Sequence, residues 1–166
     1  MTDLSSHPTS QEFRTAMRAV VGNCSVITTG LGDSATGLVV TSAISLSAEP
    51  PLLLACVNRS SSTWPVLKDS GFFGWSSLGA AHQPVAERFS GVGGLRGLAR
   101  FDGANWDTAI SGARLLVGAP VAFDCAVEEM IDRATHSVLI GRVLAIRTTA
   151  KAGALAYWDG EYRVLA

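Results

Sequence analysis

The sequence has few charged residues for its length. Asp, Glu, Lys and Arg make up 16% of its 166 residues, whereas 48% are hydrophobic. A typical globular domain carries about 25% charged residues. Because disordered chains combine low hydrophobicity with high net charge, disorder is excluded as the main state. The shortage of charge predicts a deep core together with a buried subunit interface.

Signals for membranes, export and nucleic acids are missing as well. No run of about 20 apolar residues is present, so no membrane span is expected. The first residues, MTDLSSHPTS, lack the basic and apolar regions of a signal peptide. The net charge is −1 and no segment is a basic block, which argues against nucleic-acid binding.

Cysteine is scarce, and several enzyme motifs are absent. Cys24, Cys56 and Cys125 are far apart and odd in number, which argues against a disulfide framework. Each lies in an apolar run, so we expect buried free thiols and a cytoplasmic protein. Walker A, G-x-G-x-x-G and G-x-S-x-G motifs are lacking. The three histidines are not spaced as metal ligands, and no metal site is expected.

The length suits one domain. Residues 1–9 are polar and are expected to form a flexible N-terminus, followed by a single domain over residues 10–166. Thr9 and Glu12 are spaced as a capping box, which predicts an amphipathic helix over residues 10–21.

Apolar and β-branched runs dominate the rest of the chain. Strands are expected at 24–29, 35–41, 52–57, 72–78, 121–128, 137–148, 155–158 and 162–165. The continuously apolar run 52–57 predicts a strand buried on both faces. Short helices are expected at 60–69 and 83–89, and the Gly-rich stretch 90–112 is interpreted as a long surface loop. The fold class is therefore mainly β with a few short helices, arranged as an antiparallel barrel.

Two hydroxyl-rich clusters are candidates for a binding site. One spans residues 41–47, and the other spans residues 58–63 at the start of a predicted helix. Free amides at a helix start, several hydroxyls and Arg59 suit a phosphate. Ordinary loops with capping hydroxyls remain the alternative. His136, at the start of a long strand, is either a proton donor or cofactor contact, or a plain surface histidine.

The order of these segments resembles the short-chain flavin reductase family over about residues 13–165. The similarity includes a glycine-led strand with a serine-rich loop, a Pro-Pro strand with a hydroxyl-rich turn, and a following helix. It also includes a histidine before a long strand and a C-terminal hairpin. The matching residues are 13–17, 26–29, 37–47, 50–58, 60–63, Gln83 with 87–90, His136 with 140–143, and Tyr157 with 159–160 and Tyr162.

The resemblance implies an antiparallel FMN-binding split β-barrel that acts as a homodimer. It also implies FMN or FAD as cofactor and NADH or NADPH as electron donor, with His136 near the nicotinamide as the catalytic residue. The cofactor-binding residues that it implies are Gly37, Val39, Val40, Thr41, Ser42, Ser47, Cys56, Val57, Asn58, Arg59, Ser60, Ser61, Ser62, Thr63, Phe89, Ser90 and Tyr157.

The implied reaction is hydride transfer from C4 of the reduced nicotinamide to N5 of the flavin. In the leading interpretation the reduced flavin serves a partner monooxygenase. One alternative keeps the flavin bound and passes electrons to another acceptor, such as a cobalt corrinoid in cobalamin biosynthesis. A second alternative is a non-catalytic flavin-binding module. Two departures from the family pattern, Trp75-Ser76 and Ala134-Thr135, fall near the expected site.

Overall fold

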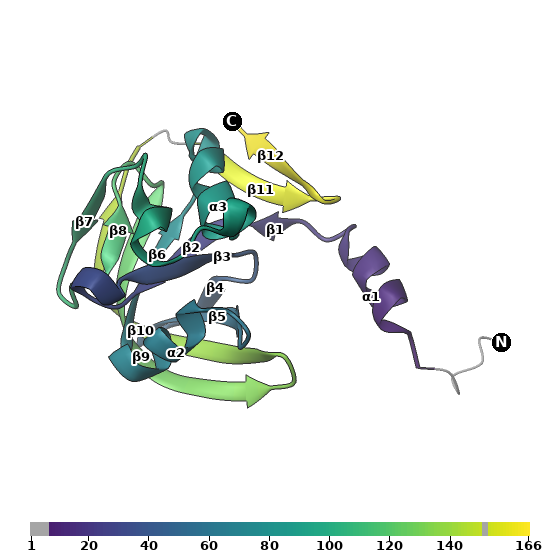
Figure 1. Ribbon diagram of the computed structural model, residues 1–166, viewed down its shortest axis with the longest axis horizontal. Coiled ribbons are helices and arrows are strands. Elements are labelled where there is room, and N and C mark those ends of the chain that lie inside the picture. The colour runs from purple at the N-terminus through teal and green to yellow at the C-terminus, as the bar shows by residue number, and fades with distance from the viewer. Residues whose placement is uncertain (1–6, 151–152) are drawn as a thin grey trace.

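The computed structural model describes residues 7–150 and 153–166, and this part of the chain is mainly β (Figure 1). Most of the N-terminal stretch predicted to be flexible, residues 1–6, lies outside the described residues. The α-helices are α1 (Ser10–Met17), α2 (Thr63–Ser70) and α3 (Gln83–Phe89), and 3₁₀ segments form at Gly32–Ser34, Ala80–His82, Val92–Gly94 and Gly97–Phe101. The strands are β1 (Gly22–Asn23), β2 (Ser25–Thr29), β3 (Thr36–Val40), β4 (Ile44–Ala48), β5 (Pro51–Asn58), β6 (Phe72–Ser77), β7 (Trp106–Thr108), β8 (Arg114–Leu116), β9 (Val121–Arg133), β10 (His136–Thr148), β11 (Ala154–Trp158) and β12 (Glu161–Leu165).

The main sheet has seven strands in the order β3-β2-β6-β9-β10-β5-β4, and every pairing in it is antiparallel. Smaller sheets are formed by β1-β11-β12 and by β7-β8. The predicted hairpins β2–β3 and β11–β12 are confirmed, the latter with Asp159-Gly160 at its turn. The long β9–β10 hairpin turns at residues 134–135, immediately before His136.

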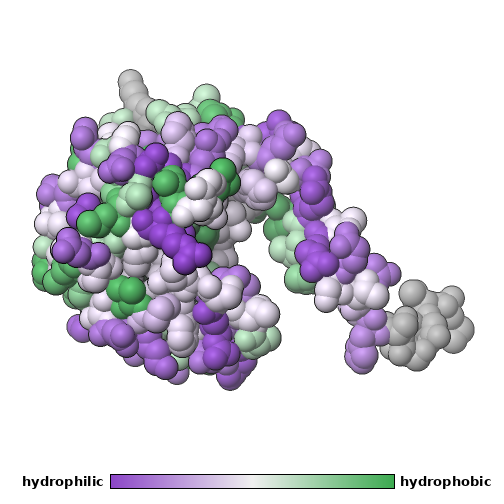
Figure 2. All heavy atoms as spheres, in the orientation of Figure 1, coloured by the Kyte–Doolittle hydropathy of each residue, from purple (hydrophilic) through white to green (hydrophobic). Residues whose placement is uncertain are grey.

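Helix α1 begins as predicted but ends early. The amide of Thr9 donates to Glu12 Oε2 at 2.7 Å, and the amide of Glu12 donates to the Thr9 hydroxyl at 3.2 Å, which completes the capping box. The helix ends at Met17 because the next amides bond three residues back rather than four. No residue of α1 is buried, so its amphipathic pattern does not mark contact with the core of this chain. The helix stands apart from the body (Figures 1 and 2).

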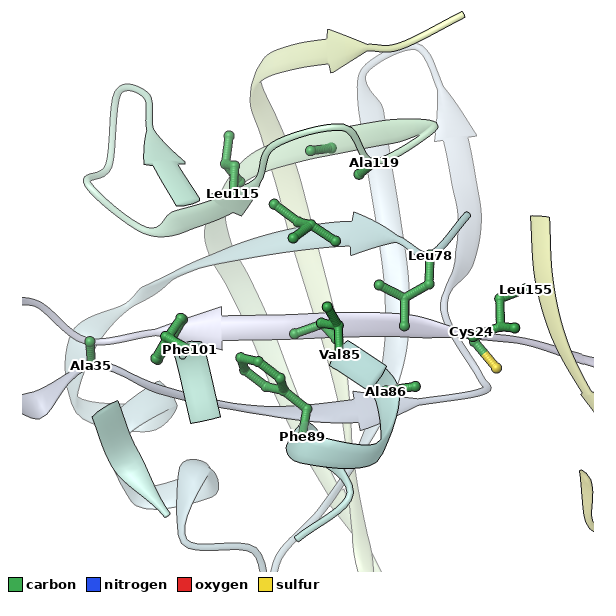
Figure 3. Close-up of a cluster of buried hydrophobic side chains, with 13 residues drawn as sticks. Cys24, Ala35, Leu78, Val85, Ala86, Phe89, Phe101, Leu115, Ala119 and Leu155 are labelled. Carbon is green, nitrogen blue, oxygen red and sulfur yellow. The ribbon is translucent and has the colours of Figure 1, made fainter. Parts of the chain in front are cut away.

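One core cluster lies where α3 and the stretch 90–112 cover β2 and β3. Val85, Ala86 and Phe89 of α3 belong to this cluster together with Phe101, and Figure 3 shows Phe89 next to Phe101. The rings of Phe89 and Phe101 are edge-to-face with centroids 5.1 Å apart, and Trp106 is 5.0 Å from Phe101. The prediction of a surface loop over 90–112 is therefore wrong in part, because aromatic side chains draw this stretch into the core.

A second cluster fills the other part of the main sheet. Strand β5 directs Leu53, Ala55 and Val57 into it, whereas the alternate side chains of β5 are only partly buried. The prediction that this strand is buried on both faces is wrong for the single chain. Residues 44–48, predicted as part of a serine-rich loop, form the edge strand β4, whose partner is β5.

The cysteines form no disulfide, as predicted. Cys24 and Cys125 are buried, and burial raises the pKa of their thiols to about 11 and about 12, with Asp124 adding to the effect at Cys125. Cys56 is only partly buried, contrary to the expectation. Among the described residues, no helix is both long and apolar enough to cross a membrane.

Candidate functional site

A cleft of about 630 Å³ lies between the loop after β5 and the end of α3. Strand β3 contributes Leu38 and Val39 to its wall. The remaining lining residues are Asn58, Ser60, Ser61, Ser62, Phe89, Ser90, Gly91, Gly94, Leu95, Arg96 and Arg100. The cleft therefore combines an apolar wall with hydroxyl groups and two guanidinium groups, and none of its lining residues is acidic.

One side of the cleft is formed by residues 58–62, between β5 and α2, which we call the serine loop. The side chains of this loop hold its conformation. Asn58 Oδ1 accepts hydrogen bonds from the amide of Ser60 at 2.9 Å and from its hydroxyl at 2.8 Å. The hydroxyl of Ser61 accepts from the amide of Thr63 at 3.1 Å. These local bonds fix the turn that leads into α2, which is the behaviour of Asn and Ser at helix starts. They present the serine side chains at the edge of the cleft.

A close contact between β3 and α3 builds the opposite wall. A Cβ atom at Gly37 would lie 2.5 Å from the Ile27 carbonyl oxygen and 2.7 Å from Phe89 Cε1. Only glycine allows the Phe89 ring to lie directly on β3. This packing places the end of α3, with Ser90, at the cleft. Gly37 itself is buried behind the wall.

Arg100 joins the loop, the strand and the helix. Its side chain is buried, with the residue 8% exposed, and its Nε donates to the Leu95 carbonyl at 3.0 Å. Its Nη1 donates to the Gly37 carbonyl and lies 3.5 Å from the Thr63 hydroxyl. Burial and the nearby charge of Arg96 lower the pKa of Arg100. Neither Arg96 nor Arg100 is among the residues predicted from the sequence, where their only signal is a position in a Gly-rich stretch.

The structure gathers some of the predicted cofactor-binding residues and separates others. Those that line the cleft are Val39, Asn58, Ser60, Ser61, Ser62, Phe89 and Ser90. Gly37, Val40, Val57 and Thr63 are buried and do not line it. The Ser42 hydroxyl accepts a hydrogen bond from the Cys56 amide at 3.0 Å, which ties the connection between β3 and β4 to strand β5.

Three predicted residues lie elsewhere. Thr41 and Tyr157 line a separate cavity of about 520 Å³ beside α1 and the β11–β12 turn. Ser47 lies on the edge strand β4. The single chain does not bring these three side chains to the cleft.

Arg59 and His136 lie next to the cleft rather than in it. Arg59 lines an adjoining hollow of about 430 Å³, which shares Asn58 and Ser60 with the cleft. His136 is exposed, stands opposite Asn58 in the β10–β5 register, and has its Nδ1 2.8 Å from the Thr135 hydroxyl. Arg59 Nη1 donates to the Ala134 carbonyl at 3.3 Å, so the serine loop and the turn before His136 are linked.

The residues that depart from the family pattern lie in two places: Trp75 and Ser76 are on β6, and Ala134 and Thr135 form the turn between β9 and β10. Trp75 is buried and stacks at a tilt on Phe123, with centroids 5.1 Å apart. The buried Ser76 hydroxyl accepts a hydrogen bond from the Leu116 amide at 3.0 Å. Ala134 adopts a φ of 48° in the hairpin turn. The first two residues therefore serve core packing, and Ala134 belongs to the turn that positions His136.

Nowhere in the described ranges do three His, Cys, Asp or Glu side chains gather as metal ligands.

Comparison with known proteins gives a consistent picture. A family described as "Flavin reductase like domain" matches residues 17–166. The chain is 34% identical to the FMN reductase (NADH) RutF of Cronobacter sakazakii over 93% of its length and 92% of the relative's. It is 36% identical to FMN reductase (NADH) RutF 2 of Methylorubrum extorquens, over 98% of this chain and 95% of that one.

Solved structures agree with this relationship. BorF, the flavin reductase component of a bacterial two-component tryptophan halogenase, superposes with a TM-score of 0.86 at 32% identity, covering 95% of this chain and 98% of BorF. The Streptomyces globisporus NADH:FAD oxidoreductase SgcE6, in complex with NAD and FAD fragments, superposes with a TM-score of 0.84 at 25% identity, covering 94% and 92% of the two chains. The expected antiparallel split-barrel fold is confirmed, and the chain belongs to the flavin reductase-like domain family.

Proposed function

We propose that this protein is an NADH-dependent flavin reductase that transfers hydride from NADH to FMN or FAD and supplies the reduced flavin to a partner monooxygenase. The observation that carries the proposal is the cleft at the serine loop, where hydroxyls and guanidiniums face an apolar wall in a chain whose relatives are FMN reductases. Such a mixture of apolar surface and a few convergent polar groups is typical of nucleotide sites.

The residues of the cleft fit a flavin nucleotide. Leu38, Val39 and Phe89 offer apolar surface for a planar ring, and the serine loop offers hydroxyls for the ribityl and phosphate groups. A bound flavin supplies a ring system that accepts hydride. The protein's own contribution is to orient the two reactants against each other and to exclude water from the apolar wall.

His136 is proposed to position the nicotinamide. Two observations support this role: Arg59 links the serine loop to the Ala134 carbonyl in the turn before His136, and His136 stands opposite Asn58 in the β10–β5 register. We expect His136→Ala to raise the KM for NADH or slow the hydride step, measured by stopped-flow absorbance. An unchanged rate and an unchanged KM would remove this role.

The proposed function is tested by the visible spectrum and by turnover. Purified protein is mixed anaerobically with FMN or FAD and NADH, and bleaching of the oxidised-flavin bands is followed with time. The expected result is NADH oxidation that depends on added flavin. Flavin bound without NADH oxidation would indicate a binding module instead. Stimulation by a cobalt corrinoid at fixed bound flavin would indicate the alternative acceptor.

A homodimer and a single functional unit over residues 10–166 are part of the proposal. The outer face of β5 is only half-buried, and α1 leaves Phe13 60% and Met17 45% exposed. A second copy of the chain is proposed to cover these apolar surfaces. Light scattering coupled to size-exclusion chromatography tests this, and a mass near the monomer's 17.3 kDa would contradict it. The free thiols support the proposed cytoplasmic location.

A further inference from the structure

Arg59, the second residue of the serine loop, makes its contacts with the turn between β9 and β10. Its amide donates to the Thr135 carbonyl at 3.0 Å, and its Nη1 donates to the Ala134 carbonyl at 3.3 Å. Its Nη2 lies 3.6 Å from Asp132 Oδ2 in an ion pair. The main chain and the side chain of one residue therefore hold this turn at three points, immediately before His136.

Asp132 is itself held by groups inside the molecule. Ser137, which pairs with Asp132 across the β9–β10 hairpin, is fully buried, and its hydroxyl donates to Asp132 Oδ1 at 2.6 Å. The same hydroxyl accepts a hydrogen bond from Trp64 Nε1 of α2 at 2.8 Å. The guanidinium of Arg59 lies over the Trp64 ring, 5.6 Å from its centroid. These polar contacts join α2, both strands of the hairpin and the serine loop, next to His136.

The contacts of Arg59 do not suit the phosphate ligand that the family resemblance implies. A guanidinium binds a phosphate best through two parallel N–H donors. In Arg59 both terminal nitrogens are directed to the turn, where Asp132 already supplies a negative charge. Arg59 is also absent from the residues that line the cleft. To reach a phosphate there, its side chain would have to release the turn.

We propose that Arg59 is a positioning residue for the nicotinamide: it ties the turn before His136 to the serine loop, so that flavin and dinucleotide bind to one rigid unit. The inference rests on the proposed function and replaces the ligand role that the resemblance implies for Arg59. Hydride transfer requires the two rings at reacting distance, and a small displacement of either ring slows it strongly. Because the loop and the turn are tied, a ligand that orders one also orders the other, and each ligand tightens the binding of the other.

The test compares Arg59→Gln with the wild type and with Arg163→Gln. Arg163 is the matched control, since it too forms an ion pair, with Glu161 at 2.7 Å, and lies over a tryptophan ring, 6.0 Å from the centroid of Trp158. It lines neither the cleft nor the adjoining hollow. We expect Arg59→Gln to raise the KM for NADH about fivefold, while the ratio of the affinities for FMN and riboflavin stays within about twofold of the wild-type ratio. The control should match the wild type in both.

Arg59→Lys separates geometry from charge. Lysine keeps the positive charge that a phosphate needs, but one ammonium group does not span the Ala134 carbonyl and the Asp132 carboxylate as the guanidinium fork does. A positioning role therefore predicts that Arg59→Lys and Arg59→Gln raise the KM for NADH alike. A fall in FMN affinity without a fall in riboflavin affinity, with the KM for NADH unchanged, would overturn the proposal and make Arg59 a phosphate ligand.

Hydrogen exchange followed by mass spectrometry, on the protein without ligands, gives a readout that needs no turnover. We expect peptides covering residues 129–140 to exchange about threefold faster in Arg59→Gln than in the wild type, and at the wild-type rate in Arg163→Gln. Unchanged exchange in Arg59→Gln would overturn the proposal, and so would faster exchange with an unchanged KM for NADH. A wild type that oxidises no NADH, while Arg59→Gln still speeds the exchange, would instead refute the proposed function alone.

Discussion

Replacing Gly37 by alanine is expected to disturb the fold and the cleft together. The added Cβ would lie 2.5 Å from the Ile27 carbonyl oxygen and 2.7 Å from Phe89 Cε1, both inside van der Waals contact. The carbonyl belongs to the neighbouring strand β2 and cannot retreat without breaking the β2–β3 pairing. The Phe89 ring is 1% exposed and held by Phe101, so it cannot rotate away freely.

The size of the effect follows from these contacts. Overpacking a rigid core costs about 1–3 kcal/mol, and contact with both backbone and ring places Gly37→Ala near the upper end, at about 3 kcal/mol. In a chain of this length that corresponds to a fall in Tm of roughly 6–12 °C. Gly71→Ala is the control, because Gly71 has a φ of 73° but nothing within 4 Å of an added Cβ. The control should lose about 1 kcal/mol, from backbone strain alone.

The assay is urea unfolding followed by tryptophan fluorescence at one fixed protein concentration. A double-mutant cycle with Phe89→Leu isolates the contact with the ring, since a smaller side chain at 89 leaves room for the new methyl group. We expect the double variant to be more stable than the sum of the single effects by about 1 kcal/mol. The reasoning is refuted if Gly37→Ala loses no more than the Gly71 control, or if the two substitutions are additive.

Three further predictions concern the periphery and the second core cluster. Burial lowers the pKa of His82 below its ordinary 6.5, so the unfolded state takes up a proton first. The contribution of His82 to the free energy of unfolding should be fully present above pH 6.5 and should be lost as the pH falls toward the pKa of the folded state. The urea midpoint of His82→Gln should therefore depend less on pH than that of the wild type. Gly141→Ala would drive a methyl group into the Phe73 ring and should cost about 2–3 kcal/mol in the same unfolding assay. Arg18→Ala breaks an ion pair with Asp159 whose partners are 57% and 58% exposed, so it should cost less than about 1 kcal/mol while speeding proteolysis near α1.

Local patterns in the sequence were sufficient for the elements that depend on local interactions. The capping box at Thr9 and the Asp159-Gly160 turn both form, because their hydrogen bonds join residues a few positions apart. The period-two pattern of 121–128 also predicts a strand that is confirmed, although burial does not alternate strictly along it, since Ala122, Asp124 and Cys125 are all buried. The prediction of a loop is wrong for the serine-rich residues of β4 (Ile44–Ala48). An edge strand whose side chains are mostly exposed has the amino-acid composition of a loop.

Only some of the residues that line the cleft can be predicted from the sequence, and these are the ones that make local hydrogen bonds. Asn58 and the serines after it can be predicted from their residue type and spacing, because their side chains accept hydrogen bonds from the backbone amides of their own turn. Arg100 is different, since its hydrogen bond to the Gly37 carbonyl joins residues 63 positions apart. No local pattern distinguishes an arginine buried by such a contact from a solvated one in a Gly-rich loop.

This division explains why the electrostatics of the site emerge only in the folded chain. The serines that line the cleft supply donors without net charge, so on their own they discriminate weakly between a phosphate and a neutral sugar hydroxyl. The positive charge belongs to the stretch 90–112. This stretch packs close to β3 because Phe101 and Trp106 contact Phe89. The same aromatic contacts that stabilise the core therefore bring the guanidinium of Arg100 opposite the serines. A substitution that loosens this aromatic group should weaken anion binding even though none of its rings carries a charge.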